Sequence, residues 1–129
     1  MYKFSKKSQE RLNTCHPDII SIFEEVIKVK DITIASGHRT PTEQLELYKQ
    51  GRTKKGNKVT NCDGYNIKSK HNYSPSLAVD VVPYPTLWSD LDEIKELSTI
   101  VKGIASELSI DIEWGGDWNR FKDYPHWQI

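Results

Sequence analysis

The stretch Leu77-Ala78-Val79-Asp80-Val81-Val82 is short, mostly β-branched, and carries one acidic residue near its centre. Such a run predicts a β-strand, and the two prolines that follow it are expected to end it. On an alternating strand Asp80 shares a face with Ala78 and Val82. A lone carboxylate in a buried strand is costly unless it is paired or bound to a metal. Asp80 is therefore either a buried acid satisfied by backbone donors or an arginine, or a metal ligand.

The segments on either side of this strand predict a mixture of helices and further strands. Apolar residues recur at three- and four-residue steps after Pro17, and Thr40-Pro41-Thr42-Glu43 has the form of a capping box. The polar stretch from Gly51 to about Lys70 predicts a long loop. We expect helices over residues 5–13, after Pro17, after Thr40 and from Ser89, and strands over residues 32–35, 77–82, 110–114 and 124–129.

The composition is that of one soluble globular domain. Hydrophobic residues make up 36% of the 129 residues, and 18 basic residues balance 18 acidic ones. A chain of this length can bury a real core as a single domain. Its zero net charge argues against a dedicated nucleic-acid binder, which usually carries a basic excess. Helices mixed with non-adjacent strands in so small a chain predict the α+β class.

The cysteines and the N-terminus bear on the compartment. Cys15 and Cys62 are too few for a disulfide framework, so we expect free thiols. No stretch approaches the roughly 18 apolar residues that a membrane helix needs. The start of the chain is charged but lacks the apolar segment of a signal peptide. The protein is therefore expected to be made in the cytoplasm without a signal peptide and without a membrane span.

Two histidines and two acids could form a hydrolytic metal site. Taken alone, His71 reads as a solvated loop histidine, and Asp123 as a turn carboxylate that caps backbone amides. If Pro125 begins an extended segment, Asp123 and His126 could face a common site across a tight bend. With Asp80 these residues supply two nitrogens, one oxygen and a spare carboxylate, the set that a hydrolytic zinc site requires.

Five motifs follow one another from about residue 30 to the end of the chain. They are Ser36-Gly-His-Arg-Thr40 with Glu43-Gln44, Ser69-x-His71, Ala78-Val-Asp80, Trp114-Gly-Gly-Asp-Trp118 and Asp123-x-Pro-His126. As an ordered set they resemble the zinc D-Ala-D-Ala peptidase family. The resemblance is closer to its phage endolysin branch, the L-alanyl-D-glutamate endopeptidases.

The resemblance implies a fold, a cofactor and roles for particular residues. The implied fold is the Hedgehog/DD-peptidase-like α+β type, with a small antiparallel sheet packed with helices. The implied cofactor is Zn²⁺, and the implied substrate is a peptidoglycan stem peptide. The roles carried over are metal ligation by His71, Asp80 and His126, catalysis by Asp123 as base and by Arg39 on the substrate side, and substrate binding by Gln44 and Ser69.

One departure from the family's compact pattern concerns the link between two of the implied ligands. Ser74-Pro75-Ser76 makes the link between His71 and Asp80 two residues longer and replaces a glycine. We expect the extra turn to bulge outward without moving His71. Asp80 is then the ligand whose geometry depends most on the fold.

The predicted function is an endolysin that cleaves the L-Ala–D-Glu bond and acts on the cell wall after release from a host cytoplasm. Residues 1–129 would form a single peptidase catalytic domain, without a separate cell-wall-binding domain, that works as a monomer. One alternative is a D-Ala-D-Ala carboxypeptidase or dipeptidase with the same zinc chemistry. Another is a zinc-bearing wall-binding module without turnover. A third is a protein that binds nucleic acid through the basic residues of the loop between Arg52 and Lys70.

Overall fold

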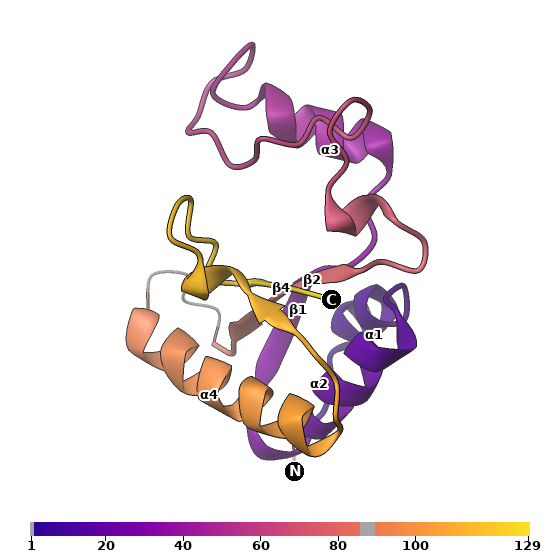
Figure 1. Ribbon diagram of the computed structural model, residues 1–129, viewed down its shortest axis with the longest axis vertical. Coiled ribbons are helices and arrows are strands. Elements are labelled where there is room, and N and C mark those ends of the chain that lie inside the picture. The colour runs from indigo at the N-terminus through magenta and orange to yellow at the C-terminus, as the bar shows by residue number, and fades with distance from the viewer. Residues whose placement is uncertain (1, 86–89) are drawn as a thin grey trace.

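A four-stranded antiparallel sheet forms the centre of the protein (Figure 1). The computed structural model describes residues 2–85 and 90–129. The strands are β1 (Ile32–Ser36), β2 (Ala78–Pro83), β3 (Glu113–Trp114) and β4 (His126–Gln128), and they lie in the order β1-β2-β4-β3. β2 is therefore a central strand, with β1 on one side and β4 on the other. This arrangement places the C-terminal residues next to the strand that carries Asp80.

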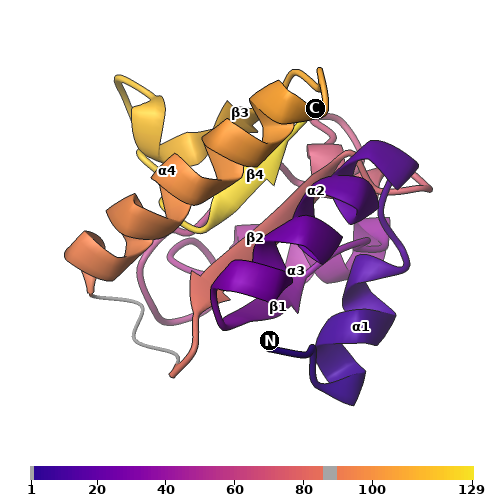
Figure 2. The ribbon, with the colours of Figure 1, turned by 90° about the horizontal axis from the view of Figure 1, so that it is seen from below.

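Three helices pack on or beside this sheet. α1 (Lys6–Leu12) contacts β1, whereas α2 (Pro17–Val29) and α4 (Leu91–Glu107) pack against each other. Figure 2 shows α2 and α4 covering one face of the sheet. The apolar stripe predicted after Pro17 is the buried face of α2. Its buried members are Ile19, Ile22, Phe23, Val26 and Ile27.

The strand alternation predicted for β2 decides which side chains enter the core. Val79 and Val81 belong to the hydrophobic core cluster on the side of α2 and α4. Trp127 of β4 joins the same cluster and meets Phe23 of α2 edge to face, with ring centroids 6.5 Å apart. Because successive residues alternate between faces, Asp80 and His126 are left on the opposite face.

The remaining elements lie over that opposite face. α3 (Pro41–Lys49) and the segment that follows it stand on the far side of the sheet from α2 and α4 (Figures 1 and 2). The predicted capping box of α3 is confirmed, because Thr40 Oγ1 accepts from the Glu43 amide and Glu43 Oε1 accepts from the Thr40 amide. The loop expected from Gly51 ends in a short 3₁₀ helix, η1 (Lys70–Asn72).

The architecture confirms the predicted α+β class with a small antiparallel sheet, but some predicted boundaries are wrong. The strand expected over residues 110–114 is limited to β3, because only Glu113 and Trp114 find partners on β4. β2 includes Pro83, which was expected to lie beyond it. Ser89, the expected start of the longest helix, lies outside the described residues, and Asp90 caps α4.

The structure also bears on the cysteines and on membrane insertion. Cys15 and Cys62 are free, as predicted, and burial raises the pKa of the Cys15 thiol to about 11. Over residues 2–85 and 90–129, no helix has the length and apolar character needed to cross a bilayer.

Gly103 offers a test of how α4 contributes to stability. It lies inside this helix, and a Cβ added there would meet nothing within 4 Å. Gly103→Ala should raise the free energy of unfolding by about 0.5–1 kcal/mol, because alanine loses less backbone entropy in a helix. Urea unfolding followed by circular dichroism measures the change. A decrease in stability would show that α4 is distorted at this position.

Candidate metal centre

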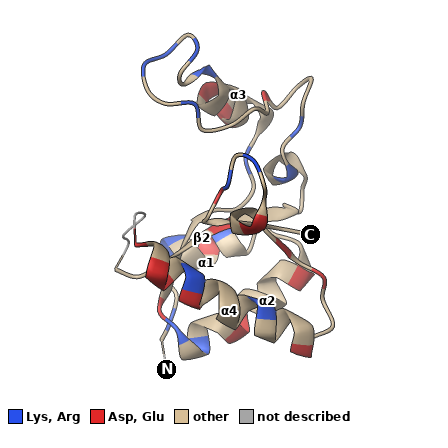
Figure 3. Cartoon of the chain, turned by 60° about the vertical axis from the view of Figure 1, so that its left-hand side comes forward, with Lys and Arg blue, Asp and Glu red and all other residues tan. Residues whose placement is uncertain are grey.

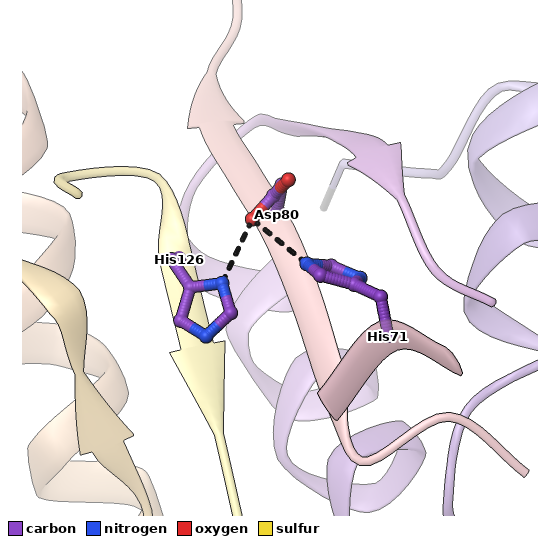
Figure 4. Close-up of side chains that lie close together, drawn as sticks. All are labelled: His71, Asp80 and His126. Carbon is purple, nitrogen blue, oxygen red and sulfur yellow. Dashed lines mark ion pairs between the residues drawn. The ribbon is translucent and has the colours of Figure 1, made fainter. Parts of the chain in front are cut away.

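Three side chains from separate segments meet on the sheet face opposite α2 and α4 (Figure 4). His71 comes from η1, Asp80 from β2 and His126 from β4. The Oδ1 atom of Asp80 lies 3.4 Å from His71 Nε2 and 3.4 Å from His126 Nδ1. One ligand atom from each residue lies within 4.8 Å of the other two. The residues predicted to hold a metal are therefore brought together.

The sheet register fixes two of these residues relative to each other. Asp80 and His126 are directly paired across β2 and β4. Side chains of paired residues stand on the same face of the sheet, about 5 Å apart at Cβ. A shift of one residue would send one of the two side chains into the core on the other face.

His71 is held by backbone and side-chain contacts of η1. Ser69 Oγ accepts from the His71 amide, and Asn72 Oδ1 accepts from the Ser69 amide, which completes a second capping box. The His71 carbonyl accepts from the Arg39 amide at 2.8 Å. In the longer link to Asp80, residues 73–75 are exposed, and the outward bulge that leaves His71 unmoved stays a prediction. Buried Ser76 donates its amide to Thr14, accepts from the His16 amide, and so anchors the start of β2.

The buried acceptors of the cluster fit a metal cation. His71 Nδ1 lies 2.7 Å from the Gly37 carbonyl oxygen, so this nitrogen carries the proton and the neutral ring presents a lone pair at Nε2. That nitrogen and Asp80 Oδ1 are both buried, and neither has a hydrogen-bond partner among the described residues. Two acceptors that face each other at 3.4 Å need a cation between them. Imidazole nitrogen and carboxylate oxygen are ligands that zinc prefers.

The electrostatics of the cluster keep Asp80 ionised. Burial opposes its ionisation, but the neighbouring His126 and His71 rings and the charge of Arg39 hold the pKa of the Asp80 carboxyl well below its usual range. Burial likewise opposes a charge on His126, yet Asp80 raises the pKa of His126 above its ordinary value. The site therefore carries a fixed negative charge that favours a cation.

Arg39 lies against the cluster rather than apart from it. Its Nη2 donates to Asp80 Oδ2 at 2.8 Å, and its Nε donates to Ser36 Oγ at 3.0 Å. Its Nη1 donates to Gln44 Oε1 at 3.4 Å. The guanidinium thus occupies one oxygen of Asp80 and leaves the other to the histidines. The contact with substrate that the resemblance implied for Arg39 stays a prediction.

Asp123 lies beside the three predicted ligands on the chain segment that precedes β4. Its Oδ2 is 3.9 Å from His126 Nδ1, and its side chain is 43% exposed. Burial and the charge of Asp80 raise the pKa of Asp123 above its ordinary value, although the histidines and Arg39 oppose this in part. The carboxylate is therefore close to the cluster and also reaches solvent.

The other predicted site residues have internal contacts. Gln44 is fully buried, and its amide nitrogen donates to Thr60 Oγ1 and to the Cys62 carbonyl oxygen. Ser69 caps η1 as described above. Contact of Gln44 or Ser69 with substrate stays a prediction. His16 caps the start of α2.

The sequence analysis missed the residues that surround His126. Its Nε2 lies 2.8 Å from Gln128 Oε1, and the Trp118 ring lies 5.2 Å from its own ring. The available signal was the spacing of two residues between His126 and Gln128, which places both on one face of a strand. Trp114 and Trp127, the other two tryptophans near this end, belong to the hydrophobic core.

A cavity of about 660 Å³ opens along the segment from β1 to α3. Arg39 and Gly37 line it, together with Lys54 and Glu46 from the α3 side. His71, Asp80 and His126 are not among its lining residues. Because Arg39 contacts Asp80 and the Gly37 carbonyl oxygen contacts His71, this cavity adjoins the three-residue cluster.

Comparison with known proteins decides the family. A profile of the family described as phage L-alanyl-D-glutamate peptidase matches residues 1–128. The chain belongs to this family. The branch indicated by the sequence motifs is thereby confirmed.

Similar proteins come from a bacterium and from a phage. The chain is 40% identical to the peptidoglycan L-alanyl-D-glutamate endopeptidase CwlK of Bacillus subtilis, over 77% of this chain and 60% of that protein. It is 27% identical to the L-alanyl-D-glutamate peptidase of Escherichia phage T5, over 95% of this chain and 86% of the phage protein. The chain thus spans well under the full length of the Bacillus relative.

A solved structure shares the fold. The crystal structure of the Serratia marcescens L-Ala D-Glu endopeptidase ChiX matches with a TM-score of 0.77 and 26% identity. The match covers 98% of this chain and 90% of the Serratia chain. The arrangement of sheet and helices is therefore that of a known endopeptidase.

Gly115 tests the packing that holds Asp123 near the cluster. A Cβ on Gly115 would lie 2.2 Å from the Asp123 carbonyl oxygen, a backbone atom that cannot simply rotate away. Gly115→Ala should therefore lower the free energy of unfolding by about 1–3 kcal/mol and push Asp123 away from His126. Urea unfolding gives the first quantity, and a crystal structure gives the second. Gly103→Ala is the matched control, and equal stability of the Gly115 variant and wild type would contradict the packing described here.

Proposed function

We propose that this protein is a zinc-dependent endopeptidase that cleaves the L-Ala–D-Glu bond of peptidoglycan stem peptides. The observation that carries the proposal is the pair of buried acceptors, His71 Nε2 and Asp80 Oδ1, facing each other at 3.4 Å with a second carboxylate nearby. Membership of the phage L-alanyl-D-glutamate peptidase family supports the choice of scissile bond. The names of the Bacillus, phage and Serratia relatives support it as well.

His71, Asp80 and His126 would hold the zinc ion. Zinc with three protein ligands and one open position supplies Lewis acidity toward water and toward a peptide carbonyl. The histidine rings present one nitrogen each, and Asp80 presents one oxygen because Arg39 occupies the other. This division of the carboxylate leaves a compact three-atom set on one face of the sheet.

Asp123 would act as general base and then as general acid. Its carboxylate lies beside the cluster and reaches solvent, so an attacking water can be within its hydrogen-bonding range. It would take a proton from that water as oxygen adds to the scissile carbonyl carbon. It would then give the proton to the leaving amine nitrogen as the C–N bond breaks. One water is thereby added across one peptide bond.

Arg39 would serve the reaction through Asp80. Three of its guanidinium nitrogens donate to Ser36, Gln44 and Asp80. A positive charge held this close also favours negative charge that develops on a carbonyl oxygen near the cluster. In this proposal Gln44 and Ser69 contribute by holding Arg39 and His71 in place.

The segment after α3, from Arg52 to Lys70, would form a positively charged surface beside the substrate. Its cationic residues outnumber its one acid, Asp63, and Figure 3 shows several blue (Lys and Arg) stretches of the chain in the loops that adjoin α3. Stem peptides carry D-Glu and terminal carboxylates, which a positive surface attracts. The cationic residues of this segment are Arg52, Lys54, Lys55, Lys58, Lys68 and Lys70.

We also propose that residues 1–129 act as a single monomeric catalytic domain. Residues of α1, α2, α4 and all four described strands share one hydrophobic core cluster, which supports one folding unit. The phage relative suggests a protein made in a host cytoplasm that acts on the wall after release.

Digestion of purified peptidoglycan tests the proposed bond and the metal together. The expected products, measured by mass spectrometry, end in a new L-Ala carboxylate on the glycan side and begin with D-Glu on the peptide side. A chelator should abolish them, and added zinc should restore them. Release of free D-Ala instead would indicate a carboxypeptidase, and an unchanged digest would indicate a binding module without turnover.

Substitutions at Asp123 and His71 separate metal binding from turnover. Asp123→Asn should keep zinc but lower the rate by about 10²–10⁴-fold, because the amide cannot take a proton. His71→Ala should lose both zinc and activity. Zinc content by atomic absorption and product release measure the two effects. Asp117→Asn is the matched control on the same connection, since Asp117 pairs with Lys102 on the surface, and full activity of Asp123→Asn would rule out the base.

A further inference from the structure

His126 and three neighbouring side chains form a closed ring of contacts, in which each side chain touches the next. His126 Nε2 lies 2.8 Å from Gln128 Oε1, and Gln128 Nε2 lies 2.8 Å from Glu113 Oε2. Trp118 Nε1 donates to the same Glu113 oxygen at 2.9 Å. The Trp118 indole completes the set of contacts, because its centroid lies 5.2 Å from the centroid of the His126 imidazole. We call His126, Gln128, Glu113 and Trp118 the His126 ring of contacts.

The Glu113 carboxylate determines, through Gln128, which nitrogen of the His126 imidazole carries the proton. An ionised carboxylate can only accept, so Glu113 requires the amide nitrogen of Gln128 to face it. The amide oxygen of Gln128 must then face His126. Because that oxygen can only accept, His126 carries a proton on Nε2, and the neutral ring then presents its lone pair at Nδ1.

The lone pair at Nδ1 is the one that the metal centre needs. His126 Nδ1 lies 3.4 Å from Asp80 Oδ1, whereas Nε2 faces Gln128. If Gln128 were turned around, its NH₂ would face His126 and favour the tautomer with the proton on Nδ1. That proton would stand where the cation has to bind. Metal-binding histidines commonly donate their second ring nitrogen to a partner that fixes the tautomer.

We propose that Gln128, oriented by Glu113, is a positioning residue that fixes His126 with its proton on Nε2 and so leaves Nδ1 for zinc. The inference rests on the proposed function, since it takes His126 to be a metal ligand. Glu113 and Trp118 act at one remove. Glu113 selects the orientation of the amide, and Trp118 holds the Glu113 carboxylate and packs on the His126 ring.

The sheet register explains why these residues can act together. Gln128 lies two residues after His126, so both stand on the same face of β4. Glu113 is directly paired with Gln128 across β3 and β4. Pairing of the two-residue strand β3 with β4 therefore places the Glu113 carboxylate opposite Gln128.

Zinc affinity measured by competition with a chromophoric chelator tests the inference without using turnover. Gln128→Leu removes the acceptor and should weaken zinc binding about 10–100-fold. Gln128→Glu should also weaken it, because a second carboxylate then faces Glu113. Gln9→Leu, a surface glutamine of α1 that bonds Asn13, is the matched control and should leave affinity unchanged.

A paired exchange distinguishes orientation from mere loss of packing. In the double variant Gln128→Glu with Glu113→Gln, residue 113 can donate to residue 128 and still accept from Trp118. Every hydrogen bond of the His126 ring of contacts is then restored, so zinc affinity should return to within about threefold of wild type, far inside the 10–100-fold loss. A double variant as weak as Gln128→Glu alone would overturn the inference, as would wild-type zinc affinity in folded Gln128→Leu.

Nitrogen NMR of the histidine rings provides a second readout that needs no substitution. In the zinc-loaded wild-type protein we expect the proton on Nε2 of His126 and the metal on Nδ1. The reverse assignment would overturn the inference. Failure of the wild-type protein to bind zinc at all would instead overturn the proposed function, so the two failures are distinguishable.

Discussion

The burial of one carboxylate, that of Asp80, sets the terms for the rest of the structure. Asp80 stands on a central strand with its side chain 13% exposed, where an unpaired charge would strongly oppose folding. Each of its oxygens therefore has its own positive or polarisable neighbour. Oδ2 is held by Arg39, and Oδ1 is left between two imidazoles. The proposed cation at Oδ1 would complete this arrangement, so metal binding would also stabilise the folded chain.

The same constraint determines which elements must be close. Arg39 follows β1, His71 lies on η1, and His126 lies on β4, so three segments distant in sequence converge on one residue of β2. Antiparallel pairing on both sides of β2 fixes this convergence to the residue. α3 has a subsidiary part, because Gln44 links it to Arg39 and to the loop that follows. The region over the sheet is therefore tied to the metal centre through Arg39.

The sequence predicted local features well and long-range contacts poorly. The stripe of α2, the capping box at Thr40 and Glu43, and the alternation of β2 depend on residues close in the chain, and the structure confirms all three. The three predicted ligands do lie close together, and they could be predicted because the family motifs follow one another in order along the sequence. Their chemical roles remain proposals.

What the sequence could not predict was set by tertiary pairing. The Arg39–Asp80 ion pair joins residues 41 apart, and the Gln128–Glu113 bond joins residues 15 apart. The strand expected over residues 110–114 was too long for a related reason. Alternation of apolar and acidic residues indicates an extended chain, but a strand also needs a partner, and β4 offers one to only two of those residues.

The elements that carry the proposed ligands differ in regularity from the one that carries the proposed base, and the proposed chemistry accounts for the difference. Asp80 and His126 stand on paired strands, and His71 is held by a capped 3₁₀ turn, because metal ligands must keep their separation with or without substrate. Asp123 lies on a connection instead, half open to solvent. A base must meet water and then a leaving amine, so it needs access and a small range of movement. Close contact between Gly115 and the Asp123 backbone limits that range.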